Sequence, residues 1–216
     1  MFSEKGKEPH RYYLCYFSSL LEMKDCDIRH LLGETYLRGY LQDSASIVVE
    51  EFSIMNGDSR VDIAVVNSVL HGIEIKSQYD SLQRLPRQCE FYNQIFDLVT
   101  IVCAPNHLKD VQSIVPSWWE ILLVDSENRE IILFRAGARN AAVCSQSLVR
   151  LLWRDEVLQA LKEFDLDRGF RSKPCNVLWN RLATELPLGD LNELVRSVLK
   201  SRTCWQSGGR HALCGG

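Results

Sequence analysis

Two short apolar runs, separated by only a few residues, constrain the fold of this chain more than any other feature. Residues 61–66 and 73–75 are rich in β-branched side chains. Asn67-Ser68 and His71-Gly72 lie between the two runs and are residue types that favour turns. Two β-rich runs joined by turn residues predict a β-hairpin.

The predicted hairpin carries three charged residues, with Asp62 at the head of the first strand and Glu74 and Lys76 on the second. Residues i and i+2 of a strand point to the same face. Glu74 and Lys76 therefore share one face, and the apolar Ile73 and Ile75 share the other. Charged groups within core-like strands are costly to bury without a partner. A divalent cation bound by the two carboxylates, with the lysine beside it, would remove that cost.

The segments around the hairpin predict an α/β fold. The apolar run 98–104 follows a helical pattern over 80–96, so 73–77, this helix and 98–104 form a crossover between parallel strands. Further helices are predicted at 25–42 and 105–114, and further strands at 47–54, 119–124 and 130–134. After residue 142 only helical patterns follow, at 148–164, 176–186 and 191–201.

We therefore expect a mixed central sheet flanked by helices, with a small all-helical C-terminal subdomain. The predicted boundaries are an α/β core over residues 1–140, a helical subdomain over 141–205 and a flexible tail over 206–216. An apolar fraction of 46% is enough to build a sizeable core.

The composition limits the kinds of partner that the protein could bind and the cellular compartment in which it would act. A net charge of −3 argues against a general nucleic-acid coat but not against a local binding groove. No apolar run approaches the ~20 residues that span a bilayer, so no membrane association is expected. The eight cysteines form no C-x-x-C pair, and the N-terminus has no apolar signal core. Free, mostly buried thiols in the reducing cytoplasm are the expectation.

The charged residues of the hairpin resemble the signature of the PD-(D/E)XK nuclease superfamily, restriction-endonuclease-like proteins. That signature is an acidic residue at the start of one strand and (D/E)-x-K on its neighbour, here Asp62 and Glu74-Ile75-Lys76. Val61 stands where many members have proline. Many members also carry Gln-x-x-x-Tyr on the next helix, which Gln88 and Tyr92 supply on one helical face.

Residues 74–96 look especially like a bacterial and phage-borne branch of the superfamily whose role is poorly defined. Members of this branch run E-I-K-S, then D, L-x-R-L-P-R-Q, Y and F-D, and continue into a helical C-terminal region. The resemblance covers roughly residues 25–200.

The resemblance implies a metal-dependent nuclease that hydrolyses phosphodiester bonds in DNA. Mg²⁺ or Mn²⁺ would be held by Asp62, Glu74 and the backbone carbonyl of Ile75, since these cations prefer hard oxygen ligands. A third acidic ligand would be Glu51, with Glu34 as the other candidate. The catalytic set would be Asp62, Glu74, Lys76, Gln88 and Tyr92. Lys76 would orient the attacking water, help to deprotonate it, or stabilise developing negative charge.

Basic side chains suggest where DNA would lie. Arg84, Arg87 and Gln88 near the start of the predicted helix could contact phosphate, helped by its free N–H groups. The C-terminal helices carry a small basic excess that points to a DNA-facing side. Its members are Arg150, Arg154, Arg196, Lys200 and Arg202.

Other interpretations remain open. The three charged residues could be a surface cluster on a half-exposed hairpin, and Tyr92 could be only a core aromatic. From a different functional class, the chain could be a non-catalytic DNA- or protein-binding module on a nuclease-like fold. Superfamily members often dimerise to cut both strands, so a homodimer is an option. Single- or double-stranded DNA or RNA, sequence preference and biological role are likewise open.

Overall fold

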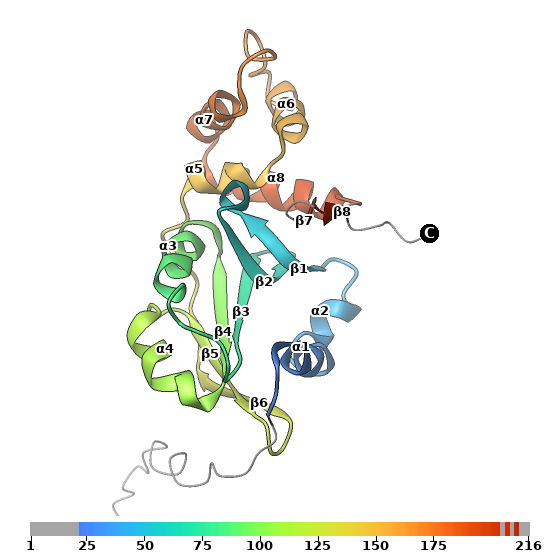
Figure 1. The fold of residues 1–216 in the computed structure, drawn as a ribbon. Helices are drawn as coiled ribbons and strands as arrows, with labels where there is room; N and C mark the ends of the chain where they lie inside the picture. Colours follow the sequence, from blue (N-terminus) through green and yellow to red (C-terminus); the bar gives the residue numbers. More distant parts are fainter. Residues whose placement is uncertain (1–21, 204–205, 208–209, 212–216) are drawn as a thin grey trace, which may run out of the picture.

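A mixed sheet of six strands organises the molecule (Figure 1). The structure, a computed structural model, describes residues 22–203, 206–207 and 210–211. The strands β1 to β6 lie side by side in sequence order. Their bounds are Ile47–Ile54, Ser59–Val66, Leu70–Lys76, Leu98–Cys103, Glu120–Asp125 and Glu130–Arg135. β3, β4 and β5 are parallel and the other neighbours antiparallel, which confirms the predicted mixed sheet.

The predicted hairpin forms from β2 and β3, in which Ile63 lies opposite Ile73. Its turn is shorter than predicted, because the Asn67 side chain closes it by accepting the Val69 N–H at 3.0 Å. The prediction that His71 and Gly72 belong to the turn is therefore wrong. Both lie within β3 and are buried.

His71 is part of a buried polar group on the sheet. Its Nε2 lies 2.7 Å from Thr100 Oγ1, and Thr100 in turn donates to Glu120 at 2.8 Å. Burial lowers the pKa of His71 to about 4, so the ring is neutral at pH 7. Tyr36 also donates to Glu120, at 2.5 Å.

The predicted crossover is confirmed: α3 (Leu85–Ile95) connects the parallel strands β3 and β4. The helix begins later than residue 80, because the Asp80 carboxylate accepts the Ser77 N–H and hydroxyl and holds the chain in a turn. Pro86 lies in the first turn, where the missing N–H costs no helical hydrogen bond. A short 3₁₀ turn (Pro105–His107) and α4 (Leu108–Ile114) connect β4 to β5.

The helix predicted over 25–42 is broken into α1 (Asp25–Glu34) and α2 (Arg38–Gln42). Thr35 leaves helical geometry at the break, with φ −119° and ψ −89°. The break turns Leu37 into the core, where it is 3% exposed. It also brings the Tyr36 hydroxyl to Glu120. Tertiary contacts thus outweigh the helical pattern here.

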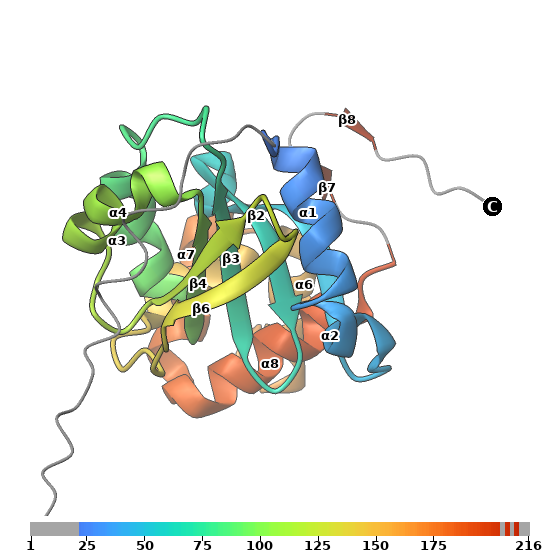
Figure 2. The same ribbon diagram turned by 90° about the horizontal axis from the view of Figure 1, so that it is seen from below.

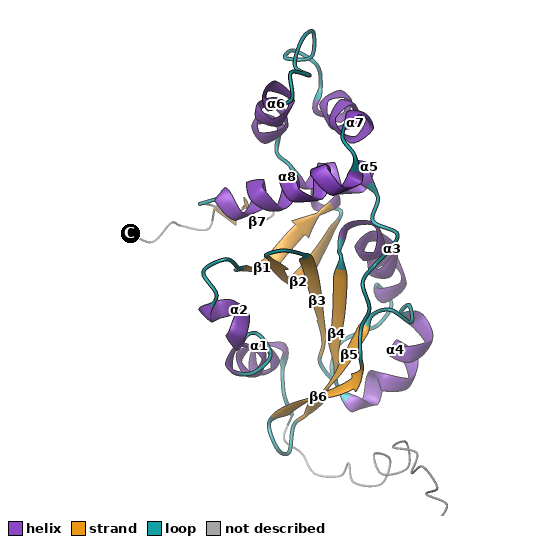
Figure 3. Ribbon diagram, turned by 180° about the vertical axis from the view of Figure 1, so that it is seen from behind, coloured by secondary structure: helices purple, strands orange, loops and turns teal. Residues whose placement is uncertain are grey.

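The two faces of the sheet bury separate apolar clusters. Helices cover both faces (Figures 2 and 3). α1 covers one face with Ile28, Leu31 and Leu32, which pack with Ile73 and Ile75 of β3. α3, α4 and the C-terminal helices cover the other face. Glu74 and Lys76 alternate with the two isoleucines and share the opposite face, as predicted. That face is the one covered by α3.

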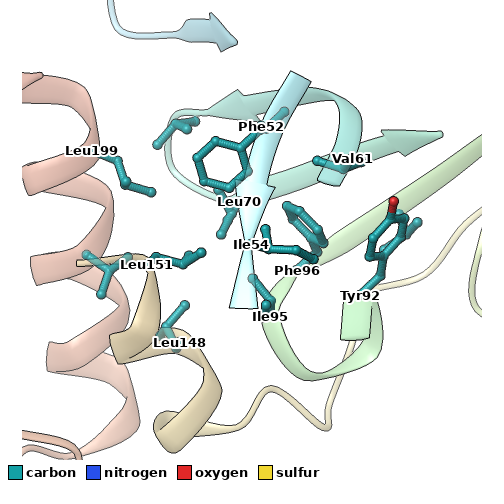
Figure 4. Close-up of a cluster of buried hydrophobic side chains, with 14 of the residues drawn as sticks. Phe52, Ile54, Val61, Leu70, Tyr92, Ile95, Phe96, Leu148, Leu151 and Leu199 are labelled. Carbon is teal, nitrogen blue, oxygen red and sulfur yellow. The ribbon is translucent and has the colours of Figure 1, made fainter. Parts of the chain in front are cut away.

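The C-terminal region is helical, as predicted, and shares the core of the sheet. It contains α5 (Ser145–Leu148), a 3₁₀ turn (Val149–Leu151), α6 (Arg154–Glu163), α7 (Cys175–Glu185) and α8 (Leu188–Ser201). Leu148, Leu151 and Leu199 lie in one buried cluster with Phe52 and Ile54 of β1 (Figure 4). The helices are therefore a layer on the end of the sheet.

Two of the five basic residues expected on a DNA-facing side, Arg196 and Arg202, pair with acidic residues of the fold. Arg202 donates to both carboxylate oxygens of Glu156, at 2.6 and 2.7 Å, and lies over the Trp153 ring. Arg196 lies 3.7 Å from the buried Asp97. Only some of the predicted set faces solvent, because these two arginines bind helices to their neighbours.

Three further expectations concern the tail, the membrane and the thiols. Gln206–Ser207 (β7) and Arg210–His211 (β8) pair antiparallel within the predicted tail, whose other residues lie outside the described part. Over the residues described, no helix has both the length and the apolar character to span a bilayer.

The thiols follow the expectation only in part. Cys89 and Cys103 are free and buried, whereas Cys26 is free and exposed.

We expect Gly72→Ala to destabilise the fold. A Cβ at Gly72 would lie 2.9 Å from Cδ2 of the fully buried Phe96 ring. Overpacking of this kind costs about 1–3 kcal/mol, measurable by urea denaturation. Gly33→Ala is the matched control, because its Cβ would meet nothing within 4 Å and alanine favours the helix. Equal stability of the two variants would contradict the prediction.

Candidate functional site

The candidate site begins where β2 and β3 separate. Their paired register runs from Val66 opposite Leu70 to Ile63 opposite Ile73 and stops there, although both strands continue. Past that point the Asp62 side chain replaces the lost backbone partner, because its Oδ2 accepts the Ile75 N–H at 2.7 Å. Asp62 is thereby fixed at the opening between the strands.

Glu74 is the centre of the site and is held by three donors. Its Oε1 accepts from Lys76 Nζ and from Gln88 Nε2, each at 2.6 Å. Its Oε2 accepts from the Tyr92 hydroxyl at 2.6 Å. The side chains of Glu74 and Lys76 are 2% and 5% exposed. The buried charges thus neutralise each other, so a cation is not needed to offset the cost of their burial.

Tyr92 is both a core aromatic and a site residue. Its ring is fully buried and stacks on Trp119, with centroids 5.9 Å apart. Its hydroxyl points away from the apolar side chains (Figure 4). The hydroxyl oxygen also lies 2.9 Å from the Arg60 carbonyl, so it connects Glu74 to β2. Gln88 and Tyr92 meet Glu74 because they share one face of α3.

Two arginines connect Glu51 of β1 to the site. Arg29 NH2 lies 2.8 Å from Glu51 Oε1 and 3.1 Å from Asp62 Oδ1. Arg60 Nε lies 2.6 Å from Glu51 Oε2. The other acidic candidate, Glu34, is exposed on α1 and lies beside His30. The structure therefore places Glu51 next to Asp62, and Glu34 apart from it.

Burial and charge shift the pKa values of the site. Burial raises the pKa of Asp62 to about 7, with the Glu74 carboxylate adding to the rise. The Ile75 N–H, Arg29 and Lys76 act in the opposite direction. Burial, and then the charge of Glu74, raises the pKa of Tyr92 well above its usual value, so the phenol stays protonated.

The oxygen atoms of the site are compatible with the binding of one hard cation. A carboxylate offers about four lone pairs, and Asp62 and Glu74 each keep at least one beyond the hydrogen bonds described above. Gln88 Oε1 is buried and has no hydrogen-bond partner, so an acceptor oxygen remains beside Glu74. Within the described ranges no group of three or more His, Cys, Asp or Glu residues could hold a metal. Any Mg²⁺ would therefore have few protein carboxylates, which is its common mode of binding.

Arg84 and Arg87 lie at the start of α3, as predicted, and both are exposed. The Arg87 guanidinium lies over the Phe91 ring, 5.3 Å from its centroid. Gln88 follows directly and reaches Glu74. The two arginines thus lie at the end of α3 that is nearest to Gln88, on the solvent side of the site.

Arg29 and Arg60 also belong to the site, although the sequence did not predict them there. Arg29 lies four residues after Asp25, the spacing of a helical ion pair, and bonds it at 2.5 Å. That local signal was present in the sequence. The contacts of Arg29 with β1 and β2 depend on how α1 packs on the sheet, which no local pattern encodes.

We expect Asp62→Asn to change how stability depends on pH in buffer with a chelator. The unfolded carboxyl ionises near 3.8 and the folded one near 7, so the folded chain holds a proton that the unfolded chain has lost. The free energy of unfolding of the wild type should therefore fall, relative to Asp62→Asn, as pH rises from about 4 to 7. Urea denaturation across this range measures the difference, and parallel profiles would contradict the raised pKa.

Comparisons with known proteins give the family. A family model described as Bacteriophage P4 protein cII matches residues 24–208, a range that includes every candidate site residue. Protein cII of Enterobacteria phage P4 is 29% identical over 176 residues, which cover 80% of this chain and 64% of the phage protein. The match thus spans less than two thirds of that relative's length.

One solved structure is also similar, the SPO1766 protein of unknown function from Silicibacter pomeroyi. It is 17% identical, with a TM-score of 0.39, over 64% of this chain and 89% of that chain. A likeness this weak bears on neither fold nor function. The family match rests on most of the chain, and the protein belongs to the bacteriophage P4 protein cII family.

Proposed function

We propose that this protein is a metal-dependent nuclease of the PD-(D/E)XK type that hydrolyses phosphodiester bonds in DNA. One observation carries the proposal: Asp62, Glu74 and Lys76 meet Gln88 and Tyr92 in one cluster where two strands separate. The acidic residue, the (D/E)-x-K strand and the helix after it contribute to that cluster in the order of the superfamily signature.

The chain offers oxygen ligands of the kind that Mg²⁺ and Mn²⁺ prefer. Asp62, Glu74 and the carbonyl oxygen of Ile75 would hold the cation, with Glu51 as the outer acidic candidate. When bound, it would supply an activated water and charge stabilisation for hydrolysis. Gln88 and Tyr92 fix the orientation of Glu74, and a fixed carboxylate requires less rearrangement during the reaction.

Lys76 provides positive charge at a buried position of the site. Its side chain is 5% exposed, and its Nζ lies 2.6 Å from Glu74. A preorganised cation in such surroundings stabilises developing negative charge more strongly than it would in water. We therefore assign to Lys76 the stabilisation of the transition state of phosphodiester hydrolysis, in which negative charge grows on the phosphate oxygens.

Arg84 and Arg87 are assigned to the DNA backbone. Both are exposed near the N-terminus of an 11-residue helix, and guanidinium groups pair well with phosphate. Contacts of this type position the duplex without reading its sequence. A homodimer and action in the cytoplasm stay predictions that follow from the resemblance and from cysteine usage.

A second candidate function is a non-catalytic binding module for DNA or protein on the same fold. The observation that favours it is the charge balance of the site. Glu74 is paired with Lys76, and Asp62 is paired with Arg29, so the carboxylates are neutralised by the chain itself. A scaffold with this pairing would need no cation.

We expect Asp62→Asn and Lys76→Met each to abolish cleavage of DNA in Mg²⁺ or Mn²⁺. Both replacements are close in shape, so the loss reports on charge rather than on packing. Removal of a positioned acid–base group costs about 10²–10⁴ in rate. Nicking of supercoiled plasmid, together with linear, single-stranded and branched substrates, measures the effect.

Lys109→Met is the matched control for the loss of a lysine, since Lys109 is exposed on α4. Its cleavage rate should equal that of the wild type. Undiminished cleavage by both site variants would overturn the nuclease assignment. Absence of cleavage and of calorimetric Mn²⁺ binding at millimolar metal would favour the binding module instead.

We expect Arg84→Ala and Arg87→Ala to weaken DNA binding equally for all sequences, because the contacts are to phosphate. Each lost contact should reduce the slope of log K against log salt by about 0.9 for duplex DNA. Fluorescence anisotropy over a salt series, in the Lys76→Met background to prevent turnover, measures the slope. Lys109→Ala should leave it unchanged, and unchanged slopes for both arginine variants would exclude them from the DNA interface.

A further inference from the structure

Arg29 uses all three of its guanidinium nitrogens to join three elements of the fold. Its Nε bonds Asp25 of α1 at 2.5 Å, and its NH1 donates to the Asp62 carbonyl of β2 at 3.1 Å. Its NH2 bonds Glu51 of β1 and the Asp62 carboxylate. The side chain is 16% exposed, so these contacts are only partly screened by water.

The NH2 nitrogen lies between the carboxylates of Glu51 and Asp62, both of which are proposed metal ligands. It is 2.8 Å from Glu51 Oε1 and 3.1 Å from Asp62 Oδ1. Mg²⁺ binds oxygen at about 2.0–2.1 Å. A cation that bridged the same two oxygens would have to enter the space between them, which this nitrogen now fills.

The guanidinium keeps its charge in this position. Burial alone would lower the pKa of Arg29, but the hydrogen bond that it donates to Asp25 and the charges of Asp62, Asp25 and Glu51 raise that pKa above its usual value. The guanidinium therefore stays charged beside these carboxylates. Its positive charge would also repel a divalent cation nearby.

We propose that Arg29 and a divalent cation compete for Glu51 and Asp62, so that metal can load onto these two carboxylates only when the guanidinium leaves them. The proposal rests on the metal-dependent function put forward above. It assigns to α1 a control over metal loading, because α1 carries both Arg29 and its anchor Asp25.

Binding that is coupled in this way is reciprocal: whatever removes the guanidinium raises the affinity for the cation. Arg29→Ala and Arg29→Gln should therefore bind Mn²⁺ about tenfold more tightly than the wild type, or better, within the 5–150-fold range of typical couplings. Isothermal titration calorimetry of the full chain with Mn²⁺ measures the affinity. Melting temperatures with chelator establish that each variant is folded.

Arg60→Ala is the matched control. Arg60 also pairs with Glu51, but its side chain is 59% exposed and has no bond to Asp62. Loss of Arg60 removes one positive charge, as loss of Arg29 does, but Arg29 still fills the space between Glu51 and Asp62. We expect a change of less than about threefold in Mn²⁺ affinity, as for an exposed ion pair.

A double-mutant cycle tests whether Arg29 affects Mn²⁺ affinity through the Glu51 carboxylate. The gain in Mn²⁺ affinity from Arg29→Gln should vanish when Glu51→Gln is also present, because the oxygen that is released no longer carries charge. A structural role for Arg29 would lower stability without raising Mn²⁺ affinity. That result separates the two roles without any assay of cleavage.

The outcomes distinguish this inference from the proposed function. Tighter Mn²⁺ binding in both Arg29 variants, but not in Arg60→Ala, supports the competition. Equal affinity in the wild type and the Arg29 variants, with binding lost in Asp62→Asn, overturns the competition and leaves the metal-dependent function intact. Absence of Mn²⁺ binding in every protein overturns both.

Discussion

The hydrogen bond from the Ile75 amide to the Asp62 carboxylate is the interaction on which the site depends. It forms where the β2–β3 ladder ends, and there it satisfies an N–H that would otherwise be buried without a partner. Leaving such a group unsatisfied costs about 1–3 kcal/mol. The same bond holds Asp62 in a partly buried position, where burial and then the nearby Glu74 carboxylate raise the pKa of Asp62 although the bond itself acts to lower it.

The buried charges are poorly explained by stability alone. Removing a carboxylate and an ammonium from water costs several kcal/mol per ion, and apolar residues of similar volume often serve the fold equally well. Glu74 and Lys76 nevertheless lie side by side at 2.6 Å, beneath two further donors from α3. A buried ion pair that stability does not require is consistent with a functional role.

Asp97 explains why the helical C-terminal region is not independent of the sheet. Its carboxylate is buried, accepts the Leu70 N–H at 2.8 Å and lies near Arg196 of α8. Its carbonyl accepts the Asn140 N–H, which holds the connection between sheet and helices. With the apolar contacts of Leu148 and Leu199, these bonds tie the helical layer to the end of β3 where the strand begins.

The sequence by itself determined the element types, the parallel crossover and the face shared by Glu74 and Lys76, because strand alternation and helical spacing are local periodicities. Spacing by four also identified Gln88 and Tyr92 as neighbours on α3. It could not place His71 or divide the helix over 25–42, since a buried bond to Thr100 and the packing of Leu37 outweigh local preference. Only the tertiary structure brought Arg29 between Glu51 and Asp62, because residues from three elements meet there through packing that no local pattern records.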